Sequence, residues 1–106
     1  MNRWNIPEEL ENEIMCRDVK CVYCRKMMTE KVHRGESRKD AATWEHIIND
    51  QTIITRDNIA RCCSACNSSK GTKKLSDWIN SEYCKNNNIN MKTVSPIIQK
   101  ALQLGL

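Results

Sequence analysis

Residues 62–71 read CCSACNSSKG and contain three cysteines, of which Cys63 and Cys66 are separated by two residues. A pair with the same spacing, Cys21 and Cys24, lies earlier in the chain within the stretch KCVYCRKM. Four thiolates in two such pairs give the closed tetrahedral coordination that structural zinc prefers. We therefore predict one zinc ion bound by these four side chains, with the KCVYCRKM stretch forming a tight metal-binding turn.

Cys62 leaves the second pair ambiguous, because Cys62 and Cys66 are also close enough in sequence to bind one ion. The equal spacing of the two pairs favours Cys63. The remaining cysteines, Cys16, Cys62 and Cys84, are expected to be small buried apolar residues. A structural ion would also support a modest core, because the 106-residue chain has no phenylalanine and 28% charged residues.

The cysteine content also bears on the compartment. Seven cysteines in a short chain are typical of disulfide-bonded secreted proteins. The first residues, MNRWNIPEEL, nevertheless lack the apolar segment of a secretion signal. No run approaches the roughly 18 apolar residues of a membrane span. We therefore expect a cytoplasmic protein with no membrane partner, in which paired cysteines bind metal.

The charge balance is mildly basic. The formal net charge is +4 and the sequence pI is about 8.7, which is below the value typical of strongly basic nucleic-acid-binding domains. Charge alone therefore permits a nucleic-acid partner without requiring one.

The chain is predicted to form a single domain over residues 1–106, because no repeat, low-complexity linker or shift in composition divides it. The core is expected at about residues 20–84. Residues 7–17, PEELENEIMCR, predict a flanking amphipathic helix, since a proline and glutamates come first and apolar residues follow at helical spacing. A serine followed by a proline predicts the start of a second flanking helix, residues 96–104.

The core pattern is that of an α+β protein. AATWEHII, residues 41–48, and NIARCC, residues 58–63, are typical of strands. The polar residues 30–40 are expected to form a loop. From Asn67 the pattern becomes helical, and the asparagines at 86–88 are expected to end it. The apolar residues of that helical stripe are Leu75, Trp78, Ile79 and Tyr83.

A carboxylate and an imidazole lie side by side in the first predicted strand. Glu45 and His46 belong to TWEHIIND, between the two cysteine pairs. A histidine next to a carboxylate can be structural, can bind a metal, or can act as a general base. The other histidine, His33, lies in the polar loop and is expected at the surface, whereas Trp44 is expected in the core.

Several chemically active residues follow one another in a characteristic order. An acidic residue and a histidine come first, and an asparagine follows at the head of the second strand. A cysteine knuckle then precedes an asparagine, a lysine and a glycine. The positions are Glu45, His46, Asn58, Cys63, Cys66, Asn67, Lys70 and Gly71. This order resembles the HNH endonucleases of the ββα-metal fold, in their four-cysteine zinc-braced form. The resemblance extends over residues 21–71. It implies a small zinc-stabilised ββα-metal domain that hydrolyses phosphodiester bonds of nucleic acid, most often DNA, leaving 5′-phosphate and 3′-hydroxyl ends.

The resemblance also implies a role for each matching residue. His46 would be the general base that takes a proton from the attacking water. Asn58 would hold the loop and the histidine in position. Glu45 and Asn67 would bind a catalytic divalent cation, Mg²⁺ or Mn²⁺, through oxygen atoms. The zinc at the four cysteines would be structural only.

Two positions depart from the usual family pattern. The residue before the histidine is usually aspartate, so Glu45 carries one extra methylene group. Asn67 stands where histidine is common, and its amide oxygen binds Mg²⁺ well but soft metals poorly. We therefore expect Mg²⁺ or Mn²⁺ to support activity better than Zn²⁺ or Ni²⁺.

Three lysines are expected to bind substrate. Lys70, Lys73 and Lys74 lie near a predicted helix N-terminus, where backbone N–H groups already favour phosphate. A solvated face is the alternative for all three. Little surface is left for reading bases, so a homodimer or a partner protein is expected to supply any sequence specificity.

Two other functions are compatible with the residues. One is a non-catalytic zinc module that binds nucleic acid or protein. The other is a hydrolase with a cysteine nucleophile, built from Cys62, His46 and Asn58. The zinc spacing of the cysteines speaks against the hydrolase.

Overall fold

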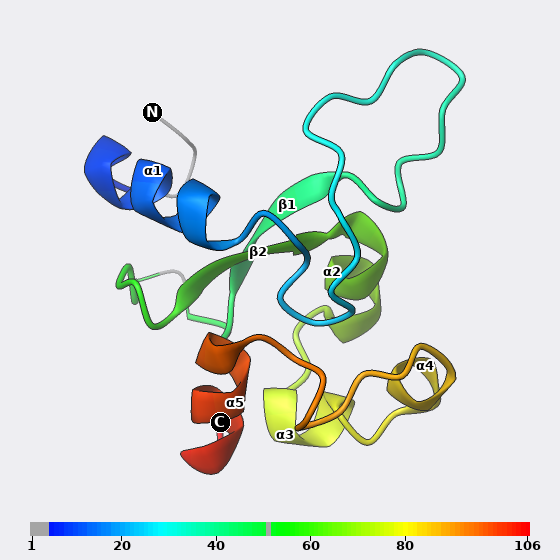
Figure 1. Ribbon diagram of the computed structural model, residues 1–106. Helices are drawn as coiled ribbons and strands as arrows, with labels where there is room; N and C mark the ends of the chain where they lie inside the picture. Colours follow the sequence, from blue (N-terminus) through cyan, green and yellow to red (C-terminus); the bar gives the residue numbers. More distant parts are fainter. Residues whose placement is uncertain (1–4, 51) are drawn as a thin grey trace.

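A two-stranded antiparallel sheet with helices on both faces forms the centre of this small α+β protein (Figure 1). The computed structural model describes residues 5–50 and 52–106. The elements are α1 (Glu8–Arg17), β1 (Ala42–His46), β2 (Ile59–Cys63), α2 (Ser64–Lys70), α3 (Leu75–Trp78), α4 (Glu82–Asn86) and α5 (Pro96–Gln103). Within the described residues, no helix has the length and apolar character needed to cross a membrane.

The register of the sheet determines which side chains share a face. β1 and β2 are antiparallel, with Ala42 opposite Cys63 and His46 opposite Ile59. Successive side chains of a strand point to opposite faces. One face therefore carries Thr43, Glu45, Ala60 and Cys62, and the other carries Trp44, His46, Ile59 and Arg61. Glu45 and His46, although adjacent in sequence, consequently lie on opposite faces of the sheet.

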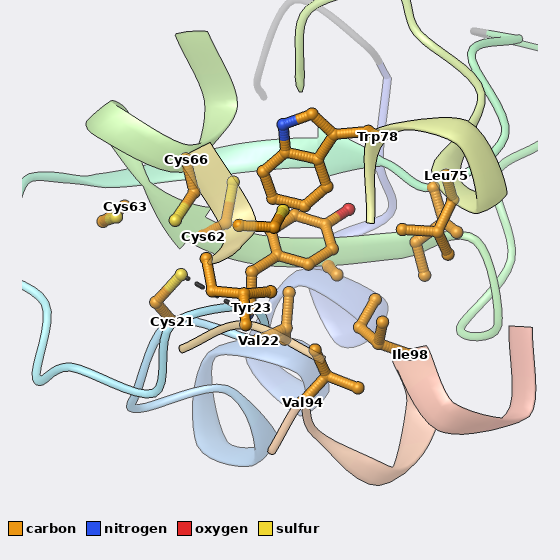
Figure 2. Packing of buried hydrophobic residues seen from close by; sticks show 14 of the residues in the cluster. Cys21, Val22, Tyr23, Cys62, Cys63, Cys66, Leu75, Trp78, Val94 and Ile98 are labelled. Atoms are coloured by element: carbon orange, nitrogen blue, oxygen red, sulfur yellow. Dashed lines mark hydrogen bonds between the residues drawn. The ribbon is translucent and has the colours of Figure 1, made fainter. Parts of the chain in front are cut away.

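The face that carries Glu45 packs against α2 and the larger hydrophobic core (Figure 2). Trp78 of α3 is at the middle of this core. The edge of the Tyr23 ring meets it with the ring centroids 4.9 Å apart, and the Tyr83 ring stacks on it at 6.0 Å. Aromatic pairs at these distances contribute beyond the area that they bury. The three rings compensate for the absence of phenylalanine.

The opposite face packs against α1. Ile14 of α1, Ile6 and Ile59 form a second buried cluster, against which Trp44 also packs. Arg17, at the end of α1, donates hydrogen bonds to the carboxylate of Asp18 and to the carbonyl oxygen of Ile59, the latter at 2.9 Å. The N-terminal helix is thus held on β2 by both apolar contacts and hydrogen bonds.

Most predicted elements are present. The helix predicted for residues 7–17 spans Glu8–Arg17, and the strand-like stretches contain β1 and β2. Residues 30–40 form a loop that projects from the body of the protein (Figure 1). The last helix begins after Ser95 as predicted, but the buried Ser95 hydroxyl makes no capping bond.

The helical region after the second knuckle differs from the prediction. Helix α2 begins at Ser64 rather than Asn67, because Cys63 is in an extended conformation and occupies the N-cap position. It ends at Lys70, where Gly71 adopts a φ of 52° and a ψ of −127°. The stripe predicted as one helix is divided between the short helices α3 and α4. Gly71, in a conformation that L-residues avoid, ends α2 and separates it from α3.

We predict that Gly71→Ala lowers the free energy of unfolding by about 1–3 kcal/mol, because a side chain at this φ and ψ is strained. A Cβ at this position would meet only Ser68 O at 3.8 Å, so the effect isolates backbone strain from steric overlap. Urea denaturation measures the change. Ser68→Ala, at an exposed position of α2, is the control and should change stability by less than about 0.5 kcal/mol. Equal stability of the two variants would contradict the assignment.

Candidate metal centre and active site

The four cysteines selected by their spacing come together. The Sγ atoms of Cys21, Cys24, Cys63 and Cys66 all lie within 4.8 Å of one another. Zinc–sulfur bonds of about 2.3 Å in a tetrahedron place sulfur atoms about 3.8 Å apart, and the Sγ atoms of Cys24 and Cys63 are 3.8 Å apart. The group therefore has the donor type and the spacing to hold a metal ion such as zinc. Cys62 lies outside it, which confirms the choice of Cys63.

Backbone hydrogen bonds shape the first knuckle. The Cys21 N–H donates to Lys26 O at 2.9 Å, and the Arg25 N–H donates to Cys21 O at 3.0 Å. The Tyr23 N–H donates to the Cys21 Sγ at 3.4 Å. Arg25 adopts a φ of 65°, which closes the turn. These bonds define the turn that carries Cys21 and Cys24.

The charge state of the cluster depends on a cation. Contacts with Cys21, then with Cys63 and Cys66, lower the pKa of the Cys24 thiol. Contacts with Cys21, Cys24 and Cys63 raise the pKa of Cys66. The neighbouring thiols thus favour ionisation of Cys24 and oppose ionisation of Cys66. A divalent cation removes this opposition, and its binding releases the remaining protons.

Glu45 is buried in the core, where it is paired with Tyr23 and Lys70. Its side chain is 5% exposed, and its Oε2 accepts a hydrogen bond of 2.8 Å from the Tyr23 hydroxyl. The Lys70 Nζ lies 3.4 Å from the same oxygen. Burial raises the pKa of Glu45, and the positive charge of Lys70 acts in the opposite direction. Burial of this carboxylate is thus compensated by one hydrogen bond and one ion pair.

The prediction that Lys70 binds substrate at the surface is wrong. Lys70 is the last residue of α2, is 0% exposed, and donates from Nζ to Ile47 O at 3.3 Å. Its ammonium group is directed to Glu45 instead, because a buried charge needs an opposite charge nearby. Lys73 and Lys74 are exposed and precede α3. They remain on the surface where a phosphate can reach them.

His46 ends β1 on the face of the sheet that packs against α1. Its side chain is 6% exposed, and its cross-strand neighbour is Ile59. Burial lowers the pKa of His46, and the negative charge of Asp50 acts in the opposite direction. A histidine with a lowered pKa is uncharged at neutral pH, so a ring nitrogen is able to accept a proton.

Asn58 holds the chain that follows His46. Its Oδ1 accepts a hydrogen bond of 2.6 Å from the Ile48 N–H. Its Nδ2 donates to the carbonyl oxygens of Ile53 at 3.0 Å and of Ile48 at 3.3 Å. The Ile47 N–H also donates to Asn58 O, at 2.8 Å. Ile47, Ile48 and Ile53 are thereby fixed to the head of β2.

Asn67 connects α2 to β1. Its Nδ2 donates to Thr43 Oγ1 at 2.9 Å and to Trp44 O at 3.2 Å. Asn67 therefore joins α2, directly after the second knuckle, to the strand that carries Glu45.

Glu45 and Asn67 carry oxygen donors of the type that a hard cation accepts. Oε2 of Glu45 contacts Tyr23 and Lys70, whereas Oε1 takes no part in those two contacts. Carboxylate and amide oxygens are ligands that Mg²⁺ accepts, and Mg²⁺ completes its shell with water and phosphate oxygens. Among the described residues, the cysteine cluster is the one group of three or more His, Cys, Asp or Glu side chains that could hold an ion. A cation at Glu45 and Asn67 would therefore depend on water and substrate.

The cysteine hydrolase is not supported by the geometry. Cys62 points to the face of the sheet that carries Glu45, opposite to the face that carries His46. Burial raises the pKa of Cys62 well above its usual value. A nucleophilic cysteine needs the reverse shift and a histidine within reach.

Sequence reasoning did not find the partners of Glu45. Tyr23 lies inside the first knuckle, and its hydroxyl group reaches a strand far away in sequence. The sequence predicted a role for Lys70 in binding substrate at the surface, and not its pairing with Glu45. Only the packing of the knuckle and α2 on β1 brings these side chains together. The remaining expected residues, His33 at the surface and Trp44 against α1, lie where they were predicted.

The chain has no significant match to a protein-family model, a curated protein or a solved structure. Its function is therefore inferred from its own residues.

We predict that the purified protein contains one zinc ion per chain and that Cys24→Ser loses both the metal and cooperative thermal unfolding. Three thiolates hold the ion less tightly, and the core depends on the ion. Elemental analysis and calorimetry measure the two effects. Cys16 was predicted to be buried, but it is exposed and lies outside the cluster, so Cys16→Ser is the control and should keep the zinc. A metal-free wild-type protein that is fully folded would contradict the prediction.

Proposed function

We propose that the chain is a zinc-braced endonuclease of the HNH type that hydrolyses phosphodiester bonds of DNA with a divalent metal ion. The observation that carries the proposal is the end of β1. There Glu45 and His46 are adjacent, Asn58 fixes the following chain, and α2 brings Asn67 onto the strand directly after the second cysteine knuckle.

Each of these residues has a chemical task in the proposal. Glu45 and Asn67 would hold Mg²⁺ or Mn²⁺ through oxygen atoms. When bound, the ion stabilises negative charge on the phosphate and on the leaving oxygen. His46, uncharged at neutral pH, takes a proton from the attacking water. Asn58 keeps the loop, and with it the histidine, in position.

The end of β1 is the place proposed for the substrate. β1 has β2 on one edge, and on its other edge the Ala42 N–H donates to Thr29 O and Trp44 O accepts from Asn67 Nδ2, so the edge in question is the stretch beyond Trp44. A phosphodiester at that edge can be approached from both faces, by Glu45 from one and by His46 from the other.

DNA is proposed as the substrate because of the resemblance, and the exposed Lys73 and Lys74 agree with a phosphate-rich partner. These lysines lie beside Ile47 and Ile48, the residues that follow the histidine, around a cavity of about 240 Å³. A homodimer or a partner protein is proposed to supply sequence specificity.

A non-catalytic zinc module that binds nucleic acid or protein is the alternative function. The specific observation in its favour is the burial of both reactive side chains. Glu45 is 5% exposed and paired with Lys70, and His46 is 6% exposed. In this alternative, the two side chains stabilise the fold and take part in no reaction.

We predict that the wild-type protein nicks supercoiled plasmid in Mg²⁺ and that His46→Ala lowers the nicking rate by about 10²–10⁴-fold, the usual contribution of a general base. Gel electrophoresis of plasmid over time measures the rate. His33→Ala is the matched control, since His33 is exposed in the projecting loop and should leave the rate unchanged. Equal nicking by the wild type and His46→Ala would favour the non-catalytic alternative.

We also predict that Mg²⁺ and Mn²⁺ support nicking better than Zn²⁺ and Ni²⁺, because the proposed ligands are oxygen atoms. EDTA should stop the reaction and added Mg²⁺ should restore it, with the zinc content measured before and after.

Asn67→Ala should raise the Mg²⁺ concentration needed for half-maximal rate, whereas Ser68→Ala, exposed on the same helix, should not. An undiminished rate in EDTA would exclude the metal-dependent mechanism.

A further inference from the structure

Tyr23 belongs at once to the cysteine cluster and to the surroundings of Glu45. It lies between Cys21 and Cys24 and is 0% exposed. Its backbone N–H donates to the Cys21 Sγ at 3.4 Å, and its hydroxyl donates to the Glu45 Oε2 at 2.8 Å. Figure 2 shows the Tyr23 ring beneath Trp78, with its hydroxyl pointing away from the cysteines. One residue thus connects a metal-binding turn to a carboxylate on β1.

The ring of Tyr23 is fixed by its neighbours. The ring centroids of Tyr23 and Trp78 are 4.9 Å apart, with an angle of 71° between the ring planes. Trp78 is itself held by a hydrogen bond of 3.0 Å from its Nε1 to Ser69 Oγ of α2. A buried ring in such contacts has one orientation. The position of the hydroxyl group is therefore set by the core and by the knuckle together.

Two donors converge on one oxygen of Glu45. The Tyr23 hydroxyl lies 2.8 Å from Oε2, and the Lys70 Nζ lies 3.4 Å from the same atom. Together they restrict the rotation of a side chain that has one more methylene group than aspartate. Oε1 takes no part in either contact. Carboxylates that bind metals are commonly oriented by such outer hydrogen bonds.

We propose that Tyr23 is a positioning residue that connects the four-cysteine zinc site to Glu45 and thereby sets the affinity of the protein for its Mg²⁺-type ion. The inference rests on the proposed function, in which Glu45 is a ligand of that ion. It explains how glutamate serves at a position where aspartate is usual, because Tyr23 and Lys70 hold the longer side chain. It also gives the zinc knuckle a task beyond stability.

The test compares two variants that each lose one tyrosine hydroxyl. Tyr23→Phe removes the bond to Glu45, whereas Tyr83→Phe removes a contact of 3.3 Å with the Cys66 Sγ on the other side of Trp78. Mn²⁺ binding to the zinc-loaded proteins is measured by electron paramagnetic resonance. Tyr23→Phe should weaken Mn²⁺ binding by about 10–100-fold with unchanged zinc content. Tyr83→Phe should bind Mn²⁺ like the wild type.

Nicking assays separate this inference from the proposed function. The Mg²⁺ concentration for half-maximal rate should rise in Tyr23→Phe by the same factor as the Mn²⁺ dissociation constant, with the rate at saturating Mg²⁺ largely kept. Wild-type Mn²⁺ binding by Tyr23→Phe, in a chain that does nick plasmid, would overturn the inference and leave the function in place. A wild-type protein that binds Mn²⁺ but does not nick would overturn the function instead.

A second measurement keeps the tyrosine hydroxyl, in case Tyr23→Phe does not fold. The chain has two tyrosines, so fluorotyrosine incorporated into Tyr83→Phe labels Tyr23 alone. The ¹⁹F resonance should shift when Mg²⁺ binds at Glu45 and should shift again when zinc is removed. A resonance that is insensitive to saturating Mg²⁺ would overturn the inference.

Discussion

The structure depends on the convergence of two cysteine pairs on one point. Cys21 and Cys24 lie in a turn after α1, while Cys63 and Cys66 join β2 to α2. A zinc ion bound there would supply about 10–16 kcal/mol, judged from comparable small zinc domains. That exceeds what a small core usually provides. An ion bound to both pairs would join the two ends of the segment between Cys24 and Cys63. That segment contains β1 and most of β2, which pair with each other inside the resulting loop. Everything proposed to be reactive lies within or directly after that loop.

Pairing among buried polar groups also stabilises the arrangement around β1. Glu45, Lys70 and Tyr23 form a connected set in which a carboxylate, an ammonium group and a hydroxyl satisfy one another. Buried polar groups are tolerated when they are paired in this way. Asn58 does the same for the backbone after β1. The end of the strand is therefore held on the side of β2, and Asn67 of α2 is bonded to its other edge at Trp44 O.

The sequence allowed much of this arrangement to be predicted, because local patterns carried it. Cysteine spacing predicted the cluster, proline and glutamates predicted α1, and two strand-like stretches, residues 41–48 and 58–63, predicted β1 and β2. Three features depended on tertiary structure instead. Lysine is normally exposed, so only the packing of α2 on β1 revealed the ion pair of Lys70 with Glu45. The early start of α2 at Ser64 and its end at Gly71 follow from the geometry of the knuckle and of one glycine. The link from Tyr23 to Glu45 joins residues far apart in sequence, and no spacing rule could show it.

The central claim is that a zinc-stabilised scaffold presents a separate oxygen site for a second, catalytic cation. Anomalous diffraction from crystals soaked in Mn²⁺ with a short DNA duplex tests this claim most directly, because zinc and manganese are distinguished at their absorption edges. We expect zinc at the four Sγ atoms and manganese bonded to oxygen atoms of Glu45 and Asn67. The His46 ring should face the phosphodiester without binding the ion. Manganese found only at the cysteines, or absent from the end of β1, would contradict the claim.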